Sequence, residues 1–274
     1  MATDYAAKYA SAVDERFTLG ALSGGVINND FDWVGVETVN VYSVPTVAMN
    51  DYSASGTSRY GTPTELEGTA QEMQVSKDRS FTFTIDRKSR DDTMMAMEAG
   101  KALRRQVDEV VIPEIDTYRF GKLVAGAPSA NISTGAISAS NAYSTLLTSQ
   151  TKLDDAKAPQ GGRVLVVSPS YYKFIKLDDN FTKRGDMATQ IAITGLVGEI
   201  DGMPVIKVPS SYLPSKVDYI ITNPACLPAP TKLESYKVHE DPPGISGWLV
   251  EGRIRYDAFV LNQKKTAIAV HKEP

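Results

Sequence analysis

The sequence predicts an α+β protein with one long helix, extended β-structure and a region of short mixed elements. Residues 89–127 place apolar side chains at three- and four-residue steps, which is the pattern of an amphipathic helix. Residues 73–85 alternate between apolar or long side chains and short polar ones, which is the period of a β-strand. Residues 131–230 change between the two patterns every few residues. We therefore expect one or two lobes, with an elongated part built on the helix.

The composition is that of a folded chain without a general affinity for nucleic acid. The 274 residues are 42% hydrophobic, which is enough to bury a core. The net charge of −4, with no cluster of Lys and Arg, argues against a general nucleic-acid binder. The single cysteine, Cys226, excludes an intrachain disulfide framework and agrees with synthesis in a reducing cytosol. We find no membrane-span pattern and no signal-peptide core, so we expect an intracellular chain at synthesis.

The N-terminal residues predict a short amphipathic helix. Tyr5, Tyr9, Val13 and Phe17 recur every four residues and so share one face of a helix. This apolar stripe could dock on another subunit or pack on its own chain, and the pattern favours neither.

Residues 31–86 predict an extended β-hairpin. Valines between residues 34 and 47 mark the outward strand, and residues 73–85 mark the return. Between the strands, residues 50–71 are rich in Ser, Gly and Thr, and a loop of about 20 residues is unusual where the median loop is about 4–6. A hairpin of this length cannot bury its own faces, so we expect a neighbouring chain to cover them.

The predicted helix begins at Ser89, which starts a capping-box pattern, and stops at Gly126. Two residues weaken it. Gly100 costs about 1 kcal/mol relative to alanine, and Pro113 removes a backbone donor. A continuous helix over this range would be roughly 50 Å long at 1.5 Å per residue, so we expect a rod across which other elements lie.

The rest of the chain predicts short elements. Residues 130–138 suggest a linker, followed by a helix over 141–157 capped by Ser140, and a second helix opens at Pro169. Strands are expected over 163–167, 190–200, 203–208 and 217–222. Two hairpins are expected near the end, 233–239 with 247–256 and 258–261 with 266–270.

The sequence carries no motif for catalysis or metal binding. Neither a phosphate-binding glycine pattern nor a nucleophile elbow is present. His239 and His271 have no second ligand at metal spacing, so we interpret each as a strand-end residue. Cys226 could act as a nucleophile with one of them, but a small buried thiol is the favoured interpretation. We expect no enzymatic activity, no catalytic residues, no cofactor and no metal.

Four groups of local runs, in order along the chain, carry a family resemblance. They are Asp78–Phe83 leading to Ile85-Asp86 and Asp91-Asp92; Val111–Arg119; Gly202–Ile206 with Val208–Ser210 and Leu213-Pro214; and Val250–Arg253 leading to Tyr256–Val260. These runs, and the order arm, hairpin, helix, mixed lobe and strand-rich end, resemble the major capsid proteins of tailed bacteriophages with the HK97-type fold. The runs look most like those in phages of low-GC Gram-positive bacteria, and together they span nearly the whole chain.

The resemblance implies four parts and an assembly. The parts are an N-terminal arm (1–30), an E-loop hairpin (31–86), a P-domain with the spine helix (87–130 and 231–257) and an A-domain (131–230 and 258–274). It implies hexamers and pentamers tiling an icosahedral shell, the virion capsid, around double-stranded DNA, after synthesis in the host cytoplasm. Portal and decoration proteins are further implied partners. A separate scaffold protein is expected, because no extra domain precedes the arm.

We expect the arm and the hairpin to contact neighbouring subunits. The candidate contact residues are Tyr5, Tyr9, Phe17, Tyr52, Arg59, Tyr60, Lys77 and Arg79. Gly100 and Pro113 are candidate points of flexure for a spine that bends as a shell expands, and a plain structural kink is equally compatible. The mild negative charge suits a wall that encloses DNA without holding it tightly.

Three alternatives stay open at this point. An encapsulin-like nanocompartment shell shares the fold and would be recognised by a groove for cargo on its inner face. A soluble hydrolase would show turnover that Cys226→Ala abolishes. A minor head or decoration protein would differ in its copy number in the particle.

Overall fold

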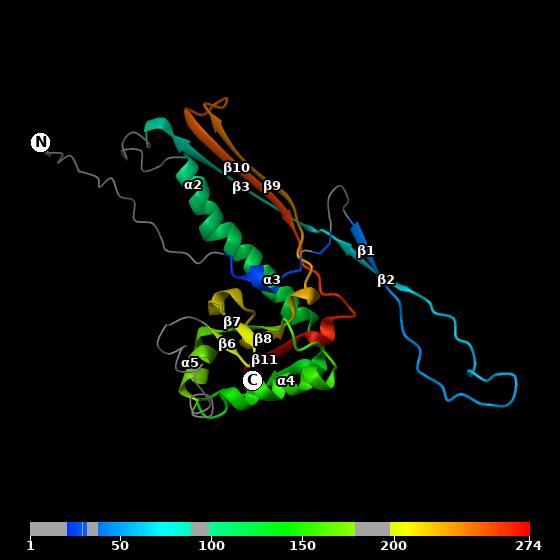
Figure 1. Ribbon diagram of the computed structural model, residues 1–274. Helices are drawn as coiled ribbons and strands as arrows, with labels where there is room; N and C mark the ends of the chain where they lie inside the picture. Colours follow the sequence, from blue (N-terminus) through cyan, green and yellow to red (C-terminus); the bar gives the residue numbers. More distant parts are fainter. Residues whose placement is uncertain (1–20, 29, 32–37, 89–98, 179–197) are drawn as a thin grey trace, which may run out of the picture.

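The computed structural model describes residues 21–28, 30–31, 38–88, 99–178 and 198–274. Figure 1 shows three parts: a compact lobe that contains the C-terminus, an elongated part beside it, and a thin β-hairpin that projects away from both. The mixture of helices and separate sheets confirms the α+β class that the sequence predicts. Among the described residues, no helix is long and apolar enough to cross a membrane.

The compact lobe is a six-stranded mixed sheet with two helices packed on it. The strand order is β4-β11-β8-β5-β7-β6, in which β4–β11 and β5–β7 are parallel pairs. The strands are β4 (Ile132–Thr134), β5 (Val164–Val167), β6 (Glu199–Ile200), β7 (Met203–Lys207), β8 (Val217–Thr222) and β11 (Ala269–Lys272). Helix α4 (Ala142–Asp155) packs against β11, and α5 (Pro169–Leu177) packs against β8. Every residue of β5 and β8 is buried, as expected for central strands covered on both faces.

Local sequence signals explain where α5 begins. The Ser168 hydroxyl accepts a hydrogen bond from the Tyr171 backbone N–H at 3.2 Å, and Pro169 occupies the first turn. The sequence predicts this start correctly. For α4 the predicted cap is wrong by one residue, because Asn141, not Ser140, occupies the N-cap position.

The long helix is confirmed from residue 99 to residue 126, while its predicted start at Ser89 lies outside the described residues. It consists of α2 (Ala99–Gln106), a π-helical turn η2 (Val107–Val111) and α3 (Ile112–Gly126). Pro113 lies in the first turn of α3 and has no N–H to donate to the preceding turn, and the π-turn directly before it changes the hydrogen-bond pattern there. Gly126 ends the helix against Val260, where a Cβ would lie 2.5 Å from Val260 Cγ2. Flexure at Gly100 and Pro113 stays a prediction.

A three-stranded antiparallel sheet lies along this helix (Figure 1). Its order is β3-β10-β9, formed by β3 (Lys77–Asp86), β10 (Gly247–Tyr256) and β9 (Thr231–Glu240). One cluster between the sheet and the helix buries Ile85, Ala99 and Val250, and a second buries Val111, Ile254 and Tyr256. The apolar stripe of the helix therefore finds its partner in this sheet.

The predicted hairpin over 31–86 is divided between two sheets. Only β1 (Thr38–Ser43) and β2 (Thr69–Gln74) pair with each other. The return strand is interrupted at Val75 and Ser76, and β3, which follows, pairs with β10. The prediction of one continuous return strand is therefore wrong. The alternation of apolar and polar residues over 73–85 does not reveal this interruption, because β2 and β3 each have one covered and one exposed face. The division of the chain into four named domains stays a prediction.

Three other expectations differ from the structure or lie outside it. The supposed linker 130–138 contains β4, which pairs with β11. The expected hairpin of 258–261 with 266–270 is absent, because residues 258–261 form no strand and β11 pairs with β4 and β8 instead. The N-terminal helix with Tyr5, Tyr9 and Phe17 and most of the predicted strand 190–200 lie outside the described residues.

Candidate assembly surface

The hairpin has two parts with different surroundings. We call the paired strands β1 and β2 the hairpin root, and residues 44–68 beyond them the hairpin tip. The last pair of the ladder is Ser43 with Thr69, so the tip lies entirely outside the sheet. Figure 1 shows the tip extending into open space.

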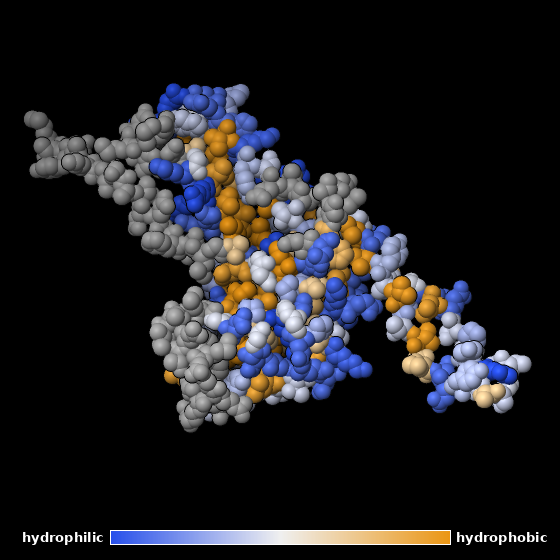
Figure 2. All heavy atoms as spheres, viewed as in Figure 1, coloured by the Kyte–Doolittle hydropathy of each residue, from blue (hydrophilic) through white to orange (hydrophobic). Residues whose placement is uncertain are grey.

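The tip and the end of the root expose large hydrophobic side chains. Tyr42 is 75% exposed, Met49 100% and Tyr60 84%. Including these three, the large hydrophobic residues exposed between positions 42 and 66 are Tyr42, Val44, Val47, Met49, Tyr52, Tyr60 and Leu66. Figure 2 shows hydrophobic residues interspersed with polar ones along this projection. Such side chains gain stability when a partner covers them, at about 25 cal/mol per Å² of apolar surface.

Three of the predicted contact residues gather in the tip. The rings of Tyr52 and Tyr60 meet edge to face with centroids 5.2 Å apart. Arg59 donates from Nε to the Gly56 carbonyl at 3.2 Å, and the Ser53 backbone N–H donates to the Arg59 carbonyl at 3.0 Å. The tip thus has local structure while all three side chains stay exposed.

The root is fixed to the body of the protein. Met73, Val75 and Leu261 form a small buried cluster, against which Val39 and Phe259 pack. Its polar anchor is Gln71. The Gln71 amide donates to the Val260 carbonyl at 2.9 Å and accepts from the Asn262 backbone N–H at 2.9 Å. The root therefore sets the direction in which the tip projects.

A buried carboxylate joins the hairpin, the helix and the sheet. Asp257 is 1% exposed. Its Oδ2 accepts hydrogen bonds from the Ser76 backbone N–H at 2.9 Å and from the Ser76 hydroxyl at 2.7 Å. Its Oδ1 accepts a hydrogen bond from the Tyr118 hydroxyl at 2.7 Å. Burial alone would raise the pKa of Asp257, but the hydrogen bonds from Tyr118 and Ser76 outweigh it and hold the pKa below its usual value. Burial and the bond to Asp257 raise the pKa of Tyr118. Ser76 is the residue at which the chain passes from β2 to β3, so Asp257 fixes that joint.

The other two predicted contacts on the hairpin, Lys77 and Arg79, lie on β3 and have partners within the chain. Lys77 Nζ lies 5.3 Å from the centroid of the Tyr118 ring. Arg79 Nε lies 2.7 Å from Glu114 Oε1, and this bond raises the pKa of Arg79. Both side chains are nevertheless exposed, so they stay candidates for contact with a neighbour.

The last third of the predicted N-terminal arm (1–30) is docked on the long helix. Asp116 Oδ2 accepts from the Leu22 backbone N–H at 2.8 Å, and Asp116 Oδ1 accepts from the Ser23 hydroxyl at 2.6 Å. Arg119 Nη1 donates to the same hydroxyl at 2.8 Å. The arm residues before position 21 therefore start from a fixed point on α3.

Sequence reasoning assigned no role to Gln71, Asp116 or Asp257. Their partners are separated from them by more than 90 residues, so no local spacing reveals them. Asp116 and Asp257 do fall in runs that carry the family resemblance, and this was the only available signal.

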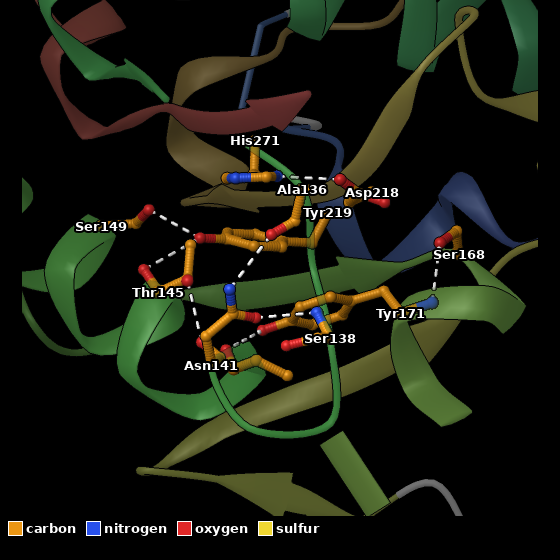
Figure 3. Close-up of polar contacts among 11 residues, drawn as sticks. Ala136, Ser138, Asn141, Thr145, Ser149, Ser168, Tyr171, Asp218, Tyr219 and His271 are labelled. Carbon is orange, nitrogen blue, oxygen red and sulfur yellow. Dashed lines mark hydrogen bonds and ion pairs between the residues drawn. The ribbon is translucent and has the colours of Figure 1, made fainter. Parts of the chain in front are cut away.

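The polar groups inside the compact lobe serve its packing. Figure 3 shows His271 of β11 beside Asp218 and stacked on Tyr219, with Tyr219 reaching Ser149 on α4. His271 Nδ1 lies 2.8 Å from Asp218 Oδ2, and the Ser149 and Tyr219 hydroxyls are 2.7 Å apart. The interpretation of His271 as a plain strand-end residue is therefore incomplete, because the side chain is buried and bonded.

The structure pairs Cys226, His239 and His271 with other groups, so it shows no cysteine–histidine pair of the kind that a nucleophilic thiol uses. The Cys226 thiol lies 3.2 Å from the Lys264 carbonyl, and burial raises the pKa of this thiol. His239 pairs with Glu251 at 3.3 Å, and His271 pairs with Asp218. The buried-thiol interpretation is confirmed. Within the part of the chain that the structure describes, no group of His, Cys, Asp or Glu could hold a metal ion.

Comparison with known proteins identifies the family. Residues 68–270, most of the chain, match the family model described as phage capsid protein. This chain belongs to the phage capsid protein family. The identity predicted from the sequence, a major capsid protein, is thereby confirmed. The match covers the return strand β2 of the hairpin, the long helix, the three-stranded sheet and most of the six-stranded sheet. The virion capsid is where this capsid protein resides, and copies of itself are its partners there.

The fold of the capsid protein is that of solved phage structures. A structure from Mycobacterium phage Che8 is similar with a TM-score of 0.80 and 16% identity, covering 99% of this chain and 98% of that one. The asymmetric unit of the bacteriophage PhiM1 mature capsid has a TM-score of 0.72 at 10% identity, over 97% of this chain and 91% of that one. A structure from Microbacterium phage Oxtober96 has a TM-score of 0.75 at 12% identity, over 98% and 96%. No curated protein matches the sequence. These likenesses confirm the HK97-type capsid fold, and nothing in them supports a nanocompartment shell or a hydrolase.

Proposed function

We propose that this capsid protein forms hexamers and pentamers of an icosahedral shell in which each hairpin tip lies on a neighbouring subunit. The observation that carries the proposal is the exposure of seven large hydrophobic side chains between Tyr42 and Leu66, on a segment that touches little of its own chain. A monomer gains nothing from leaving this surface in water, whereas a neighbour covers it on assembly. The anchored root supports the proposal, because a tip held in one direction loses less freedom when it binds.

The same proposal assigns the remaining partners. The arm with Tyr5, Tyr9 and Phe17 contacts a second neighbour, starting from the point where Asp116 holds Leu22 and Ser23. The shell encloses double-stranded DNA without sequence-specific contacts, consistent with a net charge of −4. A separate scaffold protein, a portal and decoration proteins take part in assembly, which follows synthesis in the cytoplasm of the bacterial host. The protein acts as a structural component without catalysis.

The test removes the tip and keeps the root. Residues 44–68 are replaced by Asn-Gly, a two-residue turn that can join Ser43 to Thr69 across the last pair of the ladder. The shortened chain is expected to fold, with circular dichroism and a melting temperature close to those of the unaltered chain. It is expected to form no shells in an expression system where the unaltered chain forms them, as measured by gradient sedimentation and negative-stain microscopy.

A matched control changes the tip without removing apolar surface. Thr57→Ala with Ser58→Ala alters two exposed polar side chains of the tip and is expected to leave shell formation unchanged. Normal shells from the shortened chain would contradict the proposal.

A further inference from the structure

A groove with an aromatic floor lies where the elongated part meets the compact lobe. Its volume is about 460 Å³, and its walls come from the start of β3, the first turns of α3, the end of β10 and the 3₁₀ turn η4 (Ser210–Tyr212). Tyr118, Tyr212 and Tyr256 line it together with Lys77, Arg79 and Glu114. The groove thus combines aromatic surface with charged groups, and Glu114 pairs with Arg79.

Two lysines contact the ring of Tyr118, which lines this groove. Lys77 Nζ and Lys122 Nζ each lie 5.3 Å from the centroid of Tyr118, so the two ammonium groups are at most twice that distance apart. No carboxylate of the described residues forms an ion pair with either lysine, whereas Arg79 is neutralised by Glu114. Neither lysine therefore has an ion-pair partner in the described part of its own chain, and the nearby Asp257 carboxylate is bound to Ser76 and to the Tyr118 hydroxyl.

Asp257 holds the pair of lysines in place. Its carboxylate accepts from Ser76, the residue before Lys77, and from the hydroxyl of the Tyr118 ring that both lysines contact. One buried group thus fixes the backbone that carries one lysine and the ring that orders both. A site arranged before binding loses less entropy when its ligand arrives.

The hairpin carries the complementary charge. Over residues 38–76 its acids are Asp51, Glu65, Glu67 and Glu72 and its only base is Arg59, a net charge of −3. Glu65 and Glu67 are exposed and flank Leu66 just ahead of β2. In an extended chain, side chains two residues apart share one face at roughly 7 Å. This spacing is below the upper limit on the distance between the two ammonium groups, which is twice 5.3 Å. None of the acids of the hairpin forms an ion pair with another described residue.

We propose that Glu65 and Glu67 of one subunit bind Lys77 and Lys122 of a second copy of this chain, across the ring of Tyr118. This inference rests on the proposed placement of the tip on a neighbour and adds the site that receives it. A second copy is the favoured occupant because every chain carries both the groove and the acidic segment, and the hairpin projects away from the rest of its own chain (Figure 1). A contact between two different surfaces of identical chains repeats around a ring and can close it. The paired charges set the register of the tip.

Charge reversal and its rescue test the contact. Glu65→Lys with Glu67→Lys, and separately Lys77→Glu with Lys122→Glu, are each expected to lower the yield of sedimenting shells at least about tenfold, because like charges in contact are strongly unfavourable. Combining all four substitutions is expected to restore shells, since opposite charges meet again. The control is Glu72→Lys with Lys173→Glu, which reverses one acid and one lysine at exposed positions outside the contact and is expected to assemble normally.

A covalent probe decides the matter if a charge-reversed chain fails to fold. Glu67→Cys with Lys77→Cys is expected to give a ladder of disulfide-linked subunits on non-reducing gels of assembled particles, and buried Cys226 does not compete. Glu67→Cys with Lys173→Cys is the control and should give no ladder.

Four results would overturn the inference. The first two are normal shells from both charge-reversed pairs, and a variant with all four substitutions that yields no more shells than the pairs do. The third is the absence of the disulfide-linked ladder. The fourth is intact shells from Lys77→Glu with Lys122→Glu that have lost only their nucleic acid. If the chain without residues 44–68 makes no shells while both charge-reversed pairs assemble normally, the proposed role of the tip stands and only this receiving site is wrong.

Discussion

The compact lobe and the projecting hairpin contain similar apolar residues but bury them differently. Leu165 and Ile220, on neighbouring strands of the lobe, are 0% exposed, whereas Tyr42 and Met49 on the hairpin are 75% and 100% exposed. The lobe assembles its partner surfaces from its own chain, since six strands and two helices cover one another. The hairpin has only two strands, and an isolated two-stranded ribbon is at best marginally stable. One region is complete in the monomer, and the other leaves its large apolar side chains exposed there.

The largest expected difference between the two regions is in their response to truncation. Leu165→Ala should lower the free energy of unfolding by about 3 kcal/mol, because it removes buried surface and leaves a cavity. Met49→Ala should change it by less than about 0.5 kcal/mol, since the side chain is fully exposed. Chemical denaturation of the unassembled chain measures both. Equal losses would show that the hairpin is packed in the monomer and would break the comparison.

The joint between the two regions should give an intermediate effect that depends on pH. Asp257→Asn should cost about 2 kcal/mol near neutral pH, because hydrogen bonds to a buried charge are lost. The folded pKa of Asp257 is lowered, so its stabilisation is present above the unfolded carboxyl pKa of about 3.9 and is lost as pH falls through the folded value. Melting temperatures of the two chains should therefore converge below about pH 4.

Asp51→Asn in the exposed tip is the control for that measurement and should match the unaltered chain at every pH. If the melting temperatures of Asp257→Asn and the unaltered chain differ by a constant amount down to the lowest pH, packing and not the charge of Asp257 stabilises the transition from β2 to β3.

The smallest effect is expected at the anchor of the root. Gln71→Ala should cost about 1 kcal/mol, because its two hydrogen bonds to the 260–262 loop are lost. The loss should be local, so amide hydrogens of β1 and β2 should exchange faster while those of β5 and β8 do not change. Hydrogen exchange with mass spectrometry measures this, and exposed Gln74→Ala is the control. Uniformly faster exchange would show that root and lobe unfold as one unit.

Elements with a strong local signal could be predicted from the sequence. The long helix, β5, β8 and the start of α5 at Pro169 follow from apolar period, continuous apolar runs and a serine–proline cap. Signals of this kind act within a few residues, so no knowledge of the rest of the chain is needed.

Elements that depend on distant partners could not be predicted in the same way. The change of sheet at Ser76 is decided by Asp257, which lies 181 residues further along the chain. Residues 258–261 have the composition of a strand but form none, because β11 finds its partners in β4 and β8. The candidate site shows the same limit: Tyr52, Arg59 and Tyr60 were found as exposed tip residues, whereas Gln71 and Asp257 have only long-range contacts.

The sequence by itself determined that this chain has an amphipathic rod, a lobe with a core and a polar projection too long to bury itself. Only the tertiary structure decided where the projection is rooted, which sheet receives its return strand, and that two lysines share the ring of Tyr118. The physical reason is range. Periodicity and capping act between neighbours in sequence, whereas a buried carboxylate or an amide anchor acts between segments that only the folded chain brings together.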